Sequence, residues 1–431
     1  MRRAVITGVG VVSPFGVGTS TFWRALREGR NAVRPIRSFD VTTFQTKIAA
    51  EVPIVHANRS WIEGHLTGDD SDLPFDRVLT DAEVSGALRD RKAAFTLLAG
   101  AEAWRAAGCG EAERNAPLVI ALGLEQALLE DFSPVLRNGA VDWTDEPTLS
   151  LPRVRFRSAV DLPAQLLRAL FGLKGSVIVN SSACAAGTLA VAQAAALIER
   201  GRTDVVLCGG ADSMVNPLGI GGMTRLGAPS PRNQSDACRP FDTRRDGLVI
   251  GEGAAMFVLE EEERARKRNA PRLGIVAGWG STQDAYRVTA PRPDGAAARA
   301  AMVRAIDKAR ISRDAIGYVN AHGTGTPLND PAEAKAIRDT FGPHADHLPV
   351  SSIKGAIGHL MAAAGAIEIA ASLLAFEADF LPGTTNHRQL DSECPIEVVG
   401  ESGRSARVDW LLSNSFGFGG QNASIVLGRP Q

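Results

Sequence analysis

The sequence predicts an α/β protein built as two related halves around buried sheets. Short β-branched runs alternate with Ala- and Leu-rich helical segments along the chain, which is typical of central sheets covered by helices. The segments 179–182 and 349–352 echo each other, because both lead from a strand through paired serines into a buried helix. At 431 residues the chain is long for one core, so we expect halves at 1–268 and 269–431.

In the first half, each expected strand is an apolar run that ends at glycine or at a polar turn, and the helices are Ala-rich or amphipathic. The predicted strands are 4–12, 116–123, 177–179 and 204–210, and a further apolar run covers 254–260. The predicted helices are 19–28, 92–107, 164–171, a buried helix after Cys184, and a charged helix at 261–268. We expect a surface excursion with short helices at 53–91 and a loop at 138–152.

The second half repeats this alternation of strands and helices. The predicted strands are 273–280, 316–321, 348–354, 409–413 and 423–427. The predicted helices are 297–309, 331–340 and 361–376, and a glycine turn at 416–420 separates the last two strands.

Composition excludes several classes of function. The net charge of -1 gives no electrostatic case for binding nucleic acid or an anionic membrane. Apolar runs are interrupted well short of ~18–20 residues, and no signal-peptide core follows the N-terminus, so no membrane span is expected. The cysteines number 5, without a CxxC pair, which indicates reduced thiols. We therefore expect a soluble, cytoplasmic protein.

Cys184 stands where a predicted strand turns into a helix. In the first helical turn, unpaired N–H groups and the positive end of the helix dipole stabilise a thiolate, which makes Cys184 a candidate nucleophile. The alternative is a small buried core residue, the usual role of a single cysteine. The rest of the chain must supply partners to decide between them.

A second candidate is the loop that begins at His322. A predicted strand delivers His322 next to Gly323 and Gly325, which remove side-chain bulk, while Thr324 and Thr326 offer hydroxyl donors. Such a loop can hold an imidazole beside a narrow channel and bind a polar tether within it. The alternative is a structural histidine in a surface turn.

Lys354 and His359 form a third candidate group. Both precede a helix of small apolar residues, where a charge is costly unless it is paired or used. Glu333, on the helix after the His322 loop, is the expected ion-pair partner of Lys354. The alternative for Lys354 is a solvated strand end.

The glycine turn near the C-terminus alternates Phe and Gly. Its backbone N–H groups can face a substrate oxygen, and the rings of Phe416 and Phe418 can line or gate an apolar tunnel. A phosphate-binding loop is not supported, because no G-x-x-x-x-G-K pattern is present.

These motifs occur in one order: Asn-Ser-Ser-Ala-Cys at Cys184, Asn-Ala-His-Gly-Thr-Gly-Thr at His322, Ser-Ile-Lys-Gly-x-x-Gly-His from Lys354 to His359, and Asn-Ser-Phe-Gly-Phe-Gly-Gly. Together they resemble the β-ketoacyl-[acyl carrier protein] synthases of the Cys-His-His class, over nearly the whole chain. The resemblance implies the thiolase fold, in which two pseudo-symmetric halves give five α-β-α-β-α layers. It also implies a dimer with itself or with a ketosynthase-like subunit.

The resemblance implies a decarboxylative Claisen condensation in fatty-acid or polyketide synthesis. Cys184 would carry the acyl chain, and His322 and His359 would stabilise the enolate formed from malonyl-acyl carrier protein. The backbone N–H groups of Cys184 and Phe416 would form the oxyanion hole. Lys354, paired with Glu333, would orient the histidines.

The resemblance also implies how substrates arrive. Thr324 and Thr326 would bind the phosphopantetheine arm of an acyl carrier protein, and neither metal nor cofactor is expected. The sequence departs from the family pattern at Leu124 and Glu125, where a Gly-rich run is common beside the acyl pocket. Glu125 is expected either to polarise that pocket or to form an ion pair at the dimer interface.

Two other functions fit the residues less well. A non-catalytic, chain-length-determining partner subunit usually loses the nucleophile, whereas this chain keeps Cys184 and both histidines. A degradative thiolase would use a second cysteine as acid and base, and no matching cysteine context is present.

Overall fold

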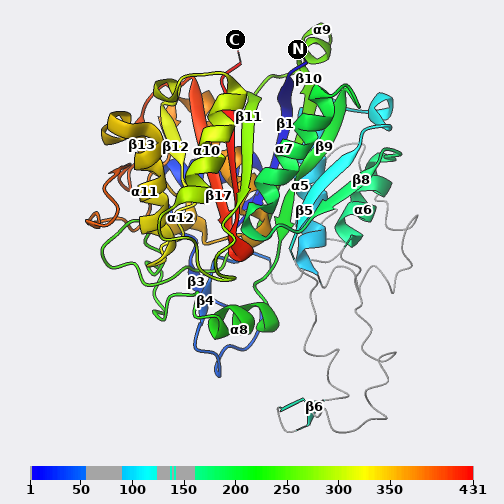
Figure 1. Ribbon diagram of the computed structural model, residues 1–431. Helices are drawn as coiled ribbons and strands as arrows, with labels where there is room; N and C mark the ends of the chain where they lie inside the picture. The colour runs from blue at the N-terminus through cyan, green and yellow to red at the C-terminus, as the bar shows by residue number, and fades with distance from the viewer. Residues whose placement is uncertain (1, 55–89, 124–135, 138–139, 142–160, 431) are drawn as a thin grey trace.

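A computed structural model describes residues 2–54, 90–123, 136–137, 140–141 and 161–430 of the chain (Figure 1). Leu124 and Glu125 lie outside these residues, as do most of the predicted excursion at 53–91 and the loop at 138–152.

Ten strands form two sheet halves with the same topology. The first half runs in the order β8 (Val177–Asn180), β5 (Leu118–Leu122), β9 (Val205–Asp212), β10 (Gly253–Glu261) and β1 (Ala4–Ser13). The second runs β13 (Pro349–Ser351), β12 (Tyr318–Asn320), β17 (Trp410–Gly417), β18 (Gln421–Gly428) and β11 (Gly274–Gln283). Numbered along the chain, both orders read 3-2-4-5-1.

Strand directions repeat as well. In each half the first three strands of that order are parallel and the last two are antiparallel to their neighbours. β1 and β11 pair antiparallel through Ala4–Val276, Val5–Ile275 and Ile6–Gly274, which joins the halves. The short strand β15 (Glu397–Val398) extends the second half beyond β13.

Helices form three layers around these sheets (Figure 1). α5 (Arg91–Ala106) packs on β1 and β10, with α6 (Leu162–Phe171) against it, and α10 (Ala296–Ala309) packs on β11 and β18, with α11 (Asn329–Phe341) against it. α7 (Ala186–Glu199) and α13 (Ala364–Ala378) contact each other and strands of both halves. The expected five-layered thiolase fold is confirmed.

The central helices approach closely because small residues face each other. A Cβ on Gly187 would lie 2.6 Å from the backbone N of Ala366, and a Cβ on Gly365 would overlap the hydroxyl of Thr188. The stretch Met361–Ala378 is long and apolar enough to cross a membrane, but 89% of it is buried inside the fold. Its apolar composition is therefore explained by the central layer.

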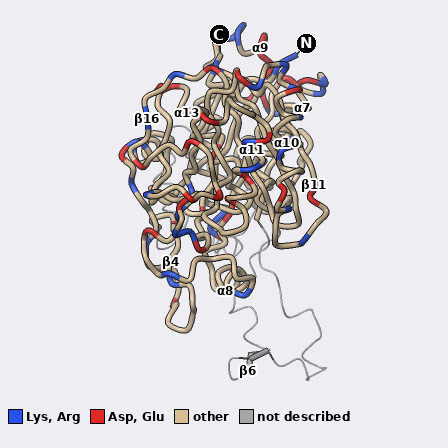
Figure 2. Tube along the Cα trace, turned by 60° about the vertical axis from the view of Figure 1, so that its left-hand side comes forward, with Lys and Arg blue, Asp and Glu red and all other residues tan. Residues whose placement is uncertain are grey.

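Smaller elements complete the described chain. The other helices are α1 (Thr19–Arg27), α8 (Pro217–Arg225), α9 (Glu262–Lys267) and α12 (Lys354–Ile357). The other strands are β2 (Gly16–Val17), β3 (Arg34–Pro35), β4 (Ile48–Ala49), β6 (Leu136–Arg137), β7 (Ala140–Val141), β14 (Phe380–Leu381) and β16 (Arg404–Ser405). Basic and acidic residues are interspersed along the described chain (Figure 2).

The glycine turn is shorter than predicted. β17 continues through Gly417, because Phe416 and Gly417 pair with Asn422 and Gln421 of β18. Only the short 3-10 turn η9 (Phe418–Gly420) remains outside the ladder. Gly419 and Gly420 adopt φ values of 79° and 77° there, which few residues other than glycine tolerate.

The two echoing segments occupy equivalent places, since β8 and β13 are both third in their half. Each leads to a residue with positive φ that opens a 3-10 turn: Ala183 at 46° opens η5 (Ala183–Ala185), and Met361 at 45° opens η8 (Met361–Ala363). The counterpart of Cys184 is therefore Ala362, and not Lys354 as the sequence echo suggests. Lys354 lies in 352–360, a segment much longer than the equivalent 181–182.

Candidate active site

Most of the predicted site residues line a single pocket of about 430 Å³. Its walls contain Cys184, His322, His359, Thr324, Thr326, Phe416 and Phe418. Cys184 enters from the start of α7 in the first half, while the other residues come from loops and strand ends of the second half. The fold thus brings together motifs that are far apart in sequence.

Cys184 lies in η5, directly before α7, and is 7% exposed. Burial raises the pKa of its thiol to about 11, while the charge of Lys354 and a hydrogen bond from the Phe418 N–H act in the opposite direction. Desolvation is the largest of these effects, and it opposes the thiolate that the sequence predicts at the helix start.

The backbone N–H that favours the thiolate form of Cys184 belongs to Phe418. Phe418 is the first residue beyond the β17–β18 ladder. Phe416 is still in β17, and its ring packs edge-on against His322 with centroids 5.9 Å apart. The predicted oxyanion pair of Cys184 and Phe416 stays a prediction, and the N–H of Phe418 is a further candidate donor beside Cys184.

His322 follows the end of β12 in a loop that Glu333 holds from α11. The Glu333 carboxylate accepts the N–H groups of His322 and Gly323 at 2.8 Å and 2.7 Å, and the side chain of Asn414 at 3.2 Å. Glu333 is 1% exposed, so these bonds form in a low-dielectric interior and fix the backbone that carries the imidazole.

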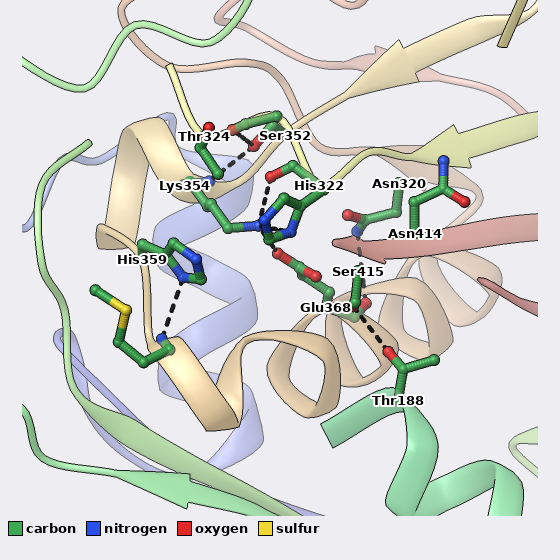
Figure 3. Close-up of polar contacts among 12 residues, drawn as sticks. Thr188, Asn320, His322, Thr324, Ser352, Lys354, His359, Glu368, Asn414 and Ser415 are labelled. Atoms are coloured by element: carbon green, nitrogen blue, oxygen red, sulfur yellow. Dashed lines mark hydrogen bonds and ion pairs between the residues drawn. The ribbon is translucent and has the colours of Figure 1, made fainter. Parts of the chain in front are cut away.

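Lys354 pairs with Glu368 of α13, which corrects the predicted pair with Glu333 (Figure 3). The ammonium also donates to the carbonyl of His322 and lies 3.3 Å from its Nδ1. Lys354 and Glu368 are each 1% exposed, so Lys354 is not a solvated strand end. Sequence reasoning missed Glu368, although it is the one charged residue in 361–376, where a charge can be buried at tolerable cost only beside a partner.

The imidazole of His359 is oriented by the turn that follows it. The N–H of Met361 donates to His359 Nδ1 at 3.1 Å (Figure 3). A backbone N–H can bond only to a ring nitrogen without a proton, so the proton of neutral His359 is on Nε2. The Lys354 ammonium at Nδ1 of His322 fixes the same tautomer there.

Both imidazoles remain neutral. Burial lowers the pKa of His322 and of His359 well below 6.5, and the charge of Lys354 acts in the same direction. Their ring centroids are 5.2 Å apart at an interplanar angle of 81°. The site therefore holds two neutral Nε2–H donors, which suits stabilisation of a negatively charged oxygen.

Thr324 and Thr326 also lie in the pocket wall, and their hydroxyls bond to each other at 2.9 Å. Gly323 and Gly325 adopt φ values of 35° and 74° in this loop. Within the described ranges, no group of three or more His, Cys, Asp or Glu side chains is arranged to hold a metal ion. The five cysteines are all free thiols.

Comparison with known proteins gives a consistent result. The N-terminal domain of β-ketoacyl synthases matches residues 1–265, and the C-terminal domain matches residues 273–388. The chain is 37% identical to 3-oxoacyl-[acyl-carrier-protein] synthase 2 of Coxiella burnetii, over 99% of each chain. It is 36% identical to the ketoacyl synthase alpha subunit of the tetracenomycin polyketide synthase of Streptomyces glaucescens, over 100% of this chain and 98% of that one.

Solved structures agree. The ishigamide ketosynthase/chain length factor is 31% identical with a TM-score of 0.83, and both chains are fully covered. A type II polyketide synthase acyl-carrier protein in complex with its hexaketide-bound ketosynthase gives a TM-score of 0.84 at 29% identity, again over both whole chains. The chain belongs to the β-ketoacyl synthase family.

Proposed function

We propose that the protein is a ketosynthase that joins an acyl chain on Cys184 to malonyl-acyl carrier protein and releases CO2. The observation that carries this proposal is the convergence of one thiol and two neutral Nε2–H imidazoles on one pocket. The thiol exchanges thioesters, and the imidazoles stabilise an enolate oxygen. Both steps of a decarboxylative condensation are thereby supplied by side chains.

In the loading step, Cys184 Sγ attacks the thioester carbonyl of an acyl carrier protein. The bond from the carbonyl carbon to the carrier sulfur breaks, and the proton lost from Cys184 Sγ ends on that sulfur, so that the carrier departs as a thiol. The N–H groups of Cys184 and Phe418 would hold the oxyanion of the tetrahedral intermediate. Gly417 supports this role, because a Cβ there would lie 3.1 Å from the backbone N of Cys184.

In the condensing step, the malonyl thioester oxygen would accept hydrogen bonds from His322 and His359. The bond between the malonyl methylene carbon and the carboxylate breaks, CO2 leaves, and the electron pair of that bond forms an enolate stabilised by these donors. The enolate carbon then attacks the acyl carbonyl, and the bond from that carbonyl carbon to Cys184 Sγ breaks with its electron pair on the sulfur. The resulting thiolate takes up a proton from solvent. The product is a 3-oxoacyl-acyl carrier protein, and no step draws on a cofactor.

Carrier proteins would deliver both substrates through the Thr324 and Thr326 side of the pocket. The relatives support this partner, since one solved neighbour is a ketosynthase bound to its acyl-carrier protein. We place the boundary between the halves at 268 and 269, supported by the repeated strand order. We assign the protein to the cytoplasm, in keeping with its free thiols.

The second candidate is a chain-length-determining partner subunit, because one structural neighbour is described as a ketosynthase/chain length factor. The complete set of Cys184, His322, Lys354 and His359 favours catalysis instead. Incubation with a panel of acyl carrier proteins, followed by intact-mass measurement, distinguishes the two. A catalytic subunit gains an acyl mass that Cys184→Ala abolishes, whereas a partner subunit gains none.

The chain length that Cys184 accepts is tested at Glu125. If Glu125 polarises the acyl pocket, Glu125→Gly improves loading of long saturated chains in the same mass assay. An unchanged chain-length profile favours an ion pair at the dimer interface.

A further inference from the structure

The two matching turns, η5 and η8, each meet the last residue of a strand from the opposite half. At η5, Gly417 at the end of β17 comes so close that a Cβ would lie 3.1 Å from the N of Cys184. At η8, Asp212 at the end of β9 accepts the N–H of Ala362 at 3.0 Å. Asp212 thus accepts the N–H of Ala362 in η8, whereas at the equivalent position Gly417 has no side chain that could accept the N–H of Cys184 in η5.

The glycine at position 417 is explained by lack of space and not by backbone conformation. Gly417 has φ −119° and ψ 158°, an extended conformation open to any residue. A side chain at this position would instead obstruct the N–H that is needed for the acyl oxygen.

Asp212 is held firmly in its place. It is 3% exposed, and a Cβ on Gly123 would overlap its carboxylate, so the glycine at the end of β5 makes room for it. The backbone N–H of Met214 also favours the charged form of this carboxylate. Burial raises the pKa of Asp212 to about 6, while these N–H groups and Lys92 favour its charged form.

The bond to Ala362 lies next to the bond that orients His359. The N–H of Met361 holds His359 Nδ1, and the following N–H, of Ala362, holds Asp212. Both donors belong to η8, which is only three residues long. A shift of this turn would therefore move the imidazole with it.

We propose that Asp212 is a positioning residue for His359: its hydrogen bond with the Ala362 N–H fixes η8, and η8 orients the imidazole of His359. The inference rests on the proposed function, because it assigns His359 to decarboxylation. Asp212 does not touch the acyl group; it acts through a turn of the opposite half. Loss of this hydrogen bond should therefore impair decarboxylation more than acyl loading of Cys184.

The test compares two variants in the full-length protein whose new side chains have the same branching and the same number of non-hydrogen atoms. Asp212→Asn keeps an oxygen that accepts the Ala362 N–H, whereas Asp212→Leu removes it. Two rates are measured by mass spectrometry: acyl transfer to the protein, and conversion of malonyl-acyl carrier protein to acetyl-acyl carrier protein with release of CO2. Asp212→Leu should lower decarboxylation at least about tenfold, since small misplacements of a catalytic group cost this much, and acyl loading should stay near the native rate. Asp212→Asn should keep both rates.

Other outcomes overturn the inference. Unchanged decarboxylation in Asp212→Leu, equal losses of both rates, or equal losses in the Asn and Leu variants would each show that the hydrogen bond does not aim His359. If Asp212→Leu does not fold, Asp212→Ala is read by the same criteria. A native protein that performs neither reaction would instead refute the proposed function, so the two failures are distinguishable.

Discussion

At the scale of single residues, the site depends on one buried ion pair. Lys354 and Glu368 are both almost inaccessible, and Lys354 also contacts His322 through its carbonyl and Nδ1. Glu368 lies on α13, whereas Lys354 opens α12, so the pair fastens the catalytic loop to the central layer. A partner lost from such a pair leaves an uncompensated buried charge.

We predict that Lys354→Met lowers the free energy of unfolding by about 3–5 kcal/mol, the usual cost of breaking a buried pair. The double variant with Glu368→Leu should recover much of that loss, because no charge then remains buried. Neither variant should condense, since His322 loses its neighbour. Urea denaturation checks the stabilities, and losses that simply add would contradict a coupled pair.

The depressed pKa of His359 makes a second prediction. As pH falls below 6.5, His359 takes up a proton in the unfolded chain but stays neutral in the folded protein. The free energy of unfolding therefore decreases as pH falls below 6.5. Between pH 7 and pH 5 the native protein should lose up to about 2 kcal/mol of stability relative to His359→Gln. Unfolding curves of both proteins at the two pH values measure this, and a pH-independent difference would refute the buried neutral imidazole.

At the scale of elements, the contact of α7 with α13 brings the two halves of the site together. Thr188 of α7 and Ser415 of β17 bond at 2.8 Å, directly where a Cβ on Gly365 would lie (Figure 3). The contact leaves no room for an added methyl group.

Gly365→Ala should therefore destabilise the protein by about 1–3 kcal/mol, the usual cost of overpacking. Gly222→Ala is the matched control, because Gly222 lies in α8 with ordinary φ, and no atom of the described residues comes within 4 Å of the place that its new methyl group would take. The control should be neutral or more stable by about 0.5–1 kcal/mol. Equal effects of the two substitutions on the urea midpoint would show that the close approach is unimportant.

Sequence reasoning succeeded where the chemistry is local. Cys184 and His322 shortly follow strand ends, His359 precedes a turn of small residues, and each lies in the pocket. It failed where the partner comes from a distant element, because Glu368 of α13 replaces Glu333 beside Lys354. The identity of that partner depends on how α13 packs against the loop that carries Lys354.

At the scale of the whole molecule, β8 ends its half of the sheet. Its one strand partner among the described residues is β5, and the N of Leu118 bonds to the O of Ser176 at 2.9 Å. In a parallel pair, the backbone N–H and C=O groups of every second residue point to the same neighbouring strand. The backbone groups of Ile178 therefore point to β5, while those of Val177 and Val179 point away from it. An unpaired edge of β-branched residues is suited to pairing with a second subunit.

Val179→Pro tests this edge, because it removes one outward N–H while proline is tolerated on an edge strand. We predict a dimer for the native protein and a weaker dimer, with unchanged thermal stability of the subunit fold, for the variant. Light scattering coupled to size exclusion measures both over a dilution series. An equally strong dimer in the variant would place the interface elsewhere.

The central claim is that Cys184, His322 and His359 act together in one decarboxylative condensation. The most direct measurement mixes protein acylated at Cys184 with malonyl-acyl carrier protein and identifies the carrier product by mass. We predict 3-oxoacyl-acyl carrier protein with loss of the acyl group from Cys184, and no such product from Cys184→Ala. Condensation by Cys184→Ala, or an acylated native protein that leaves malonyl carrier unchanged, would contradict it.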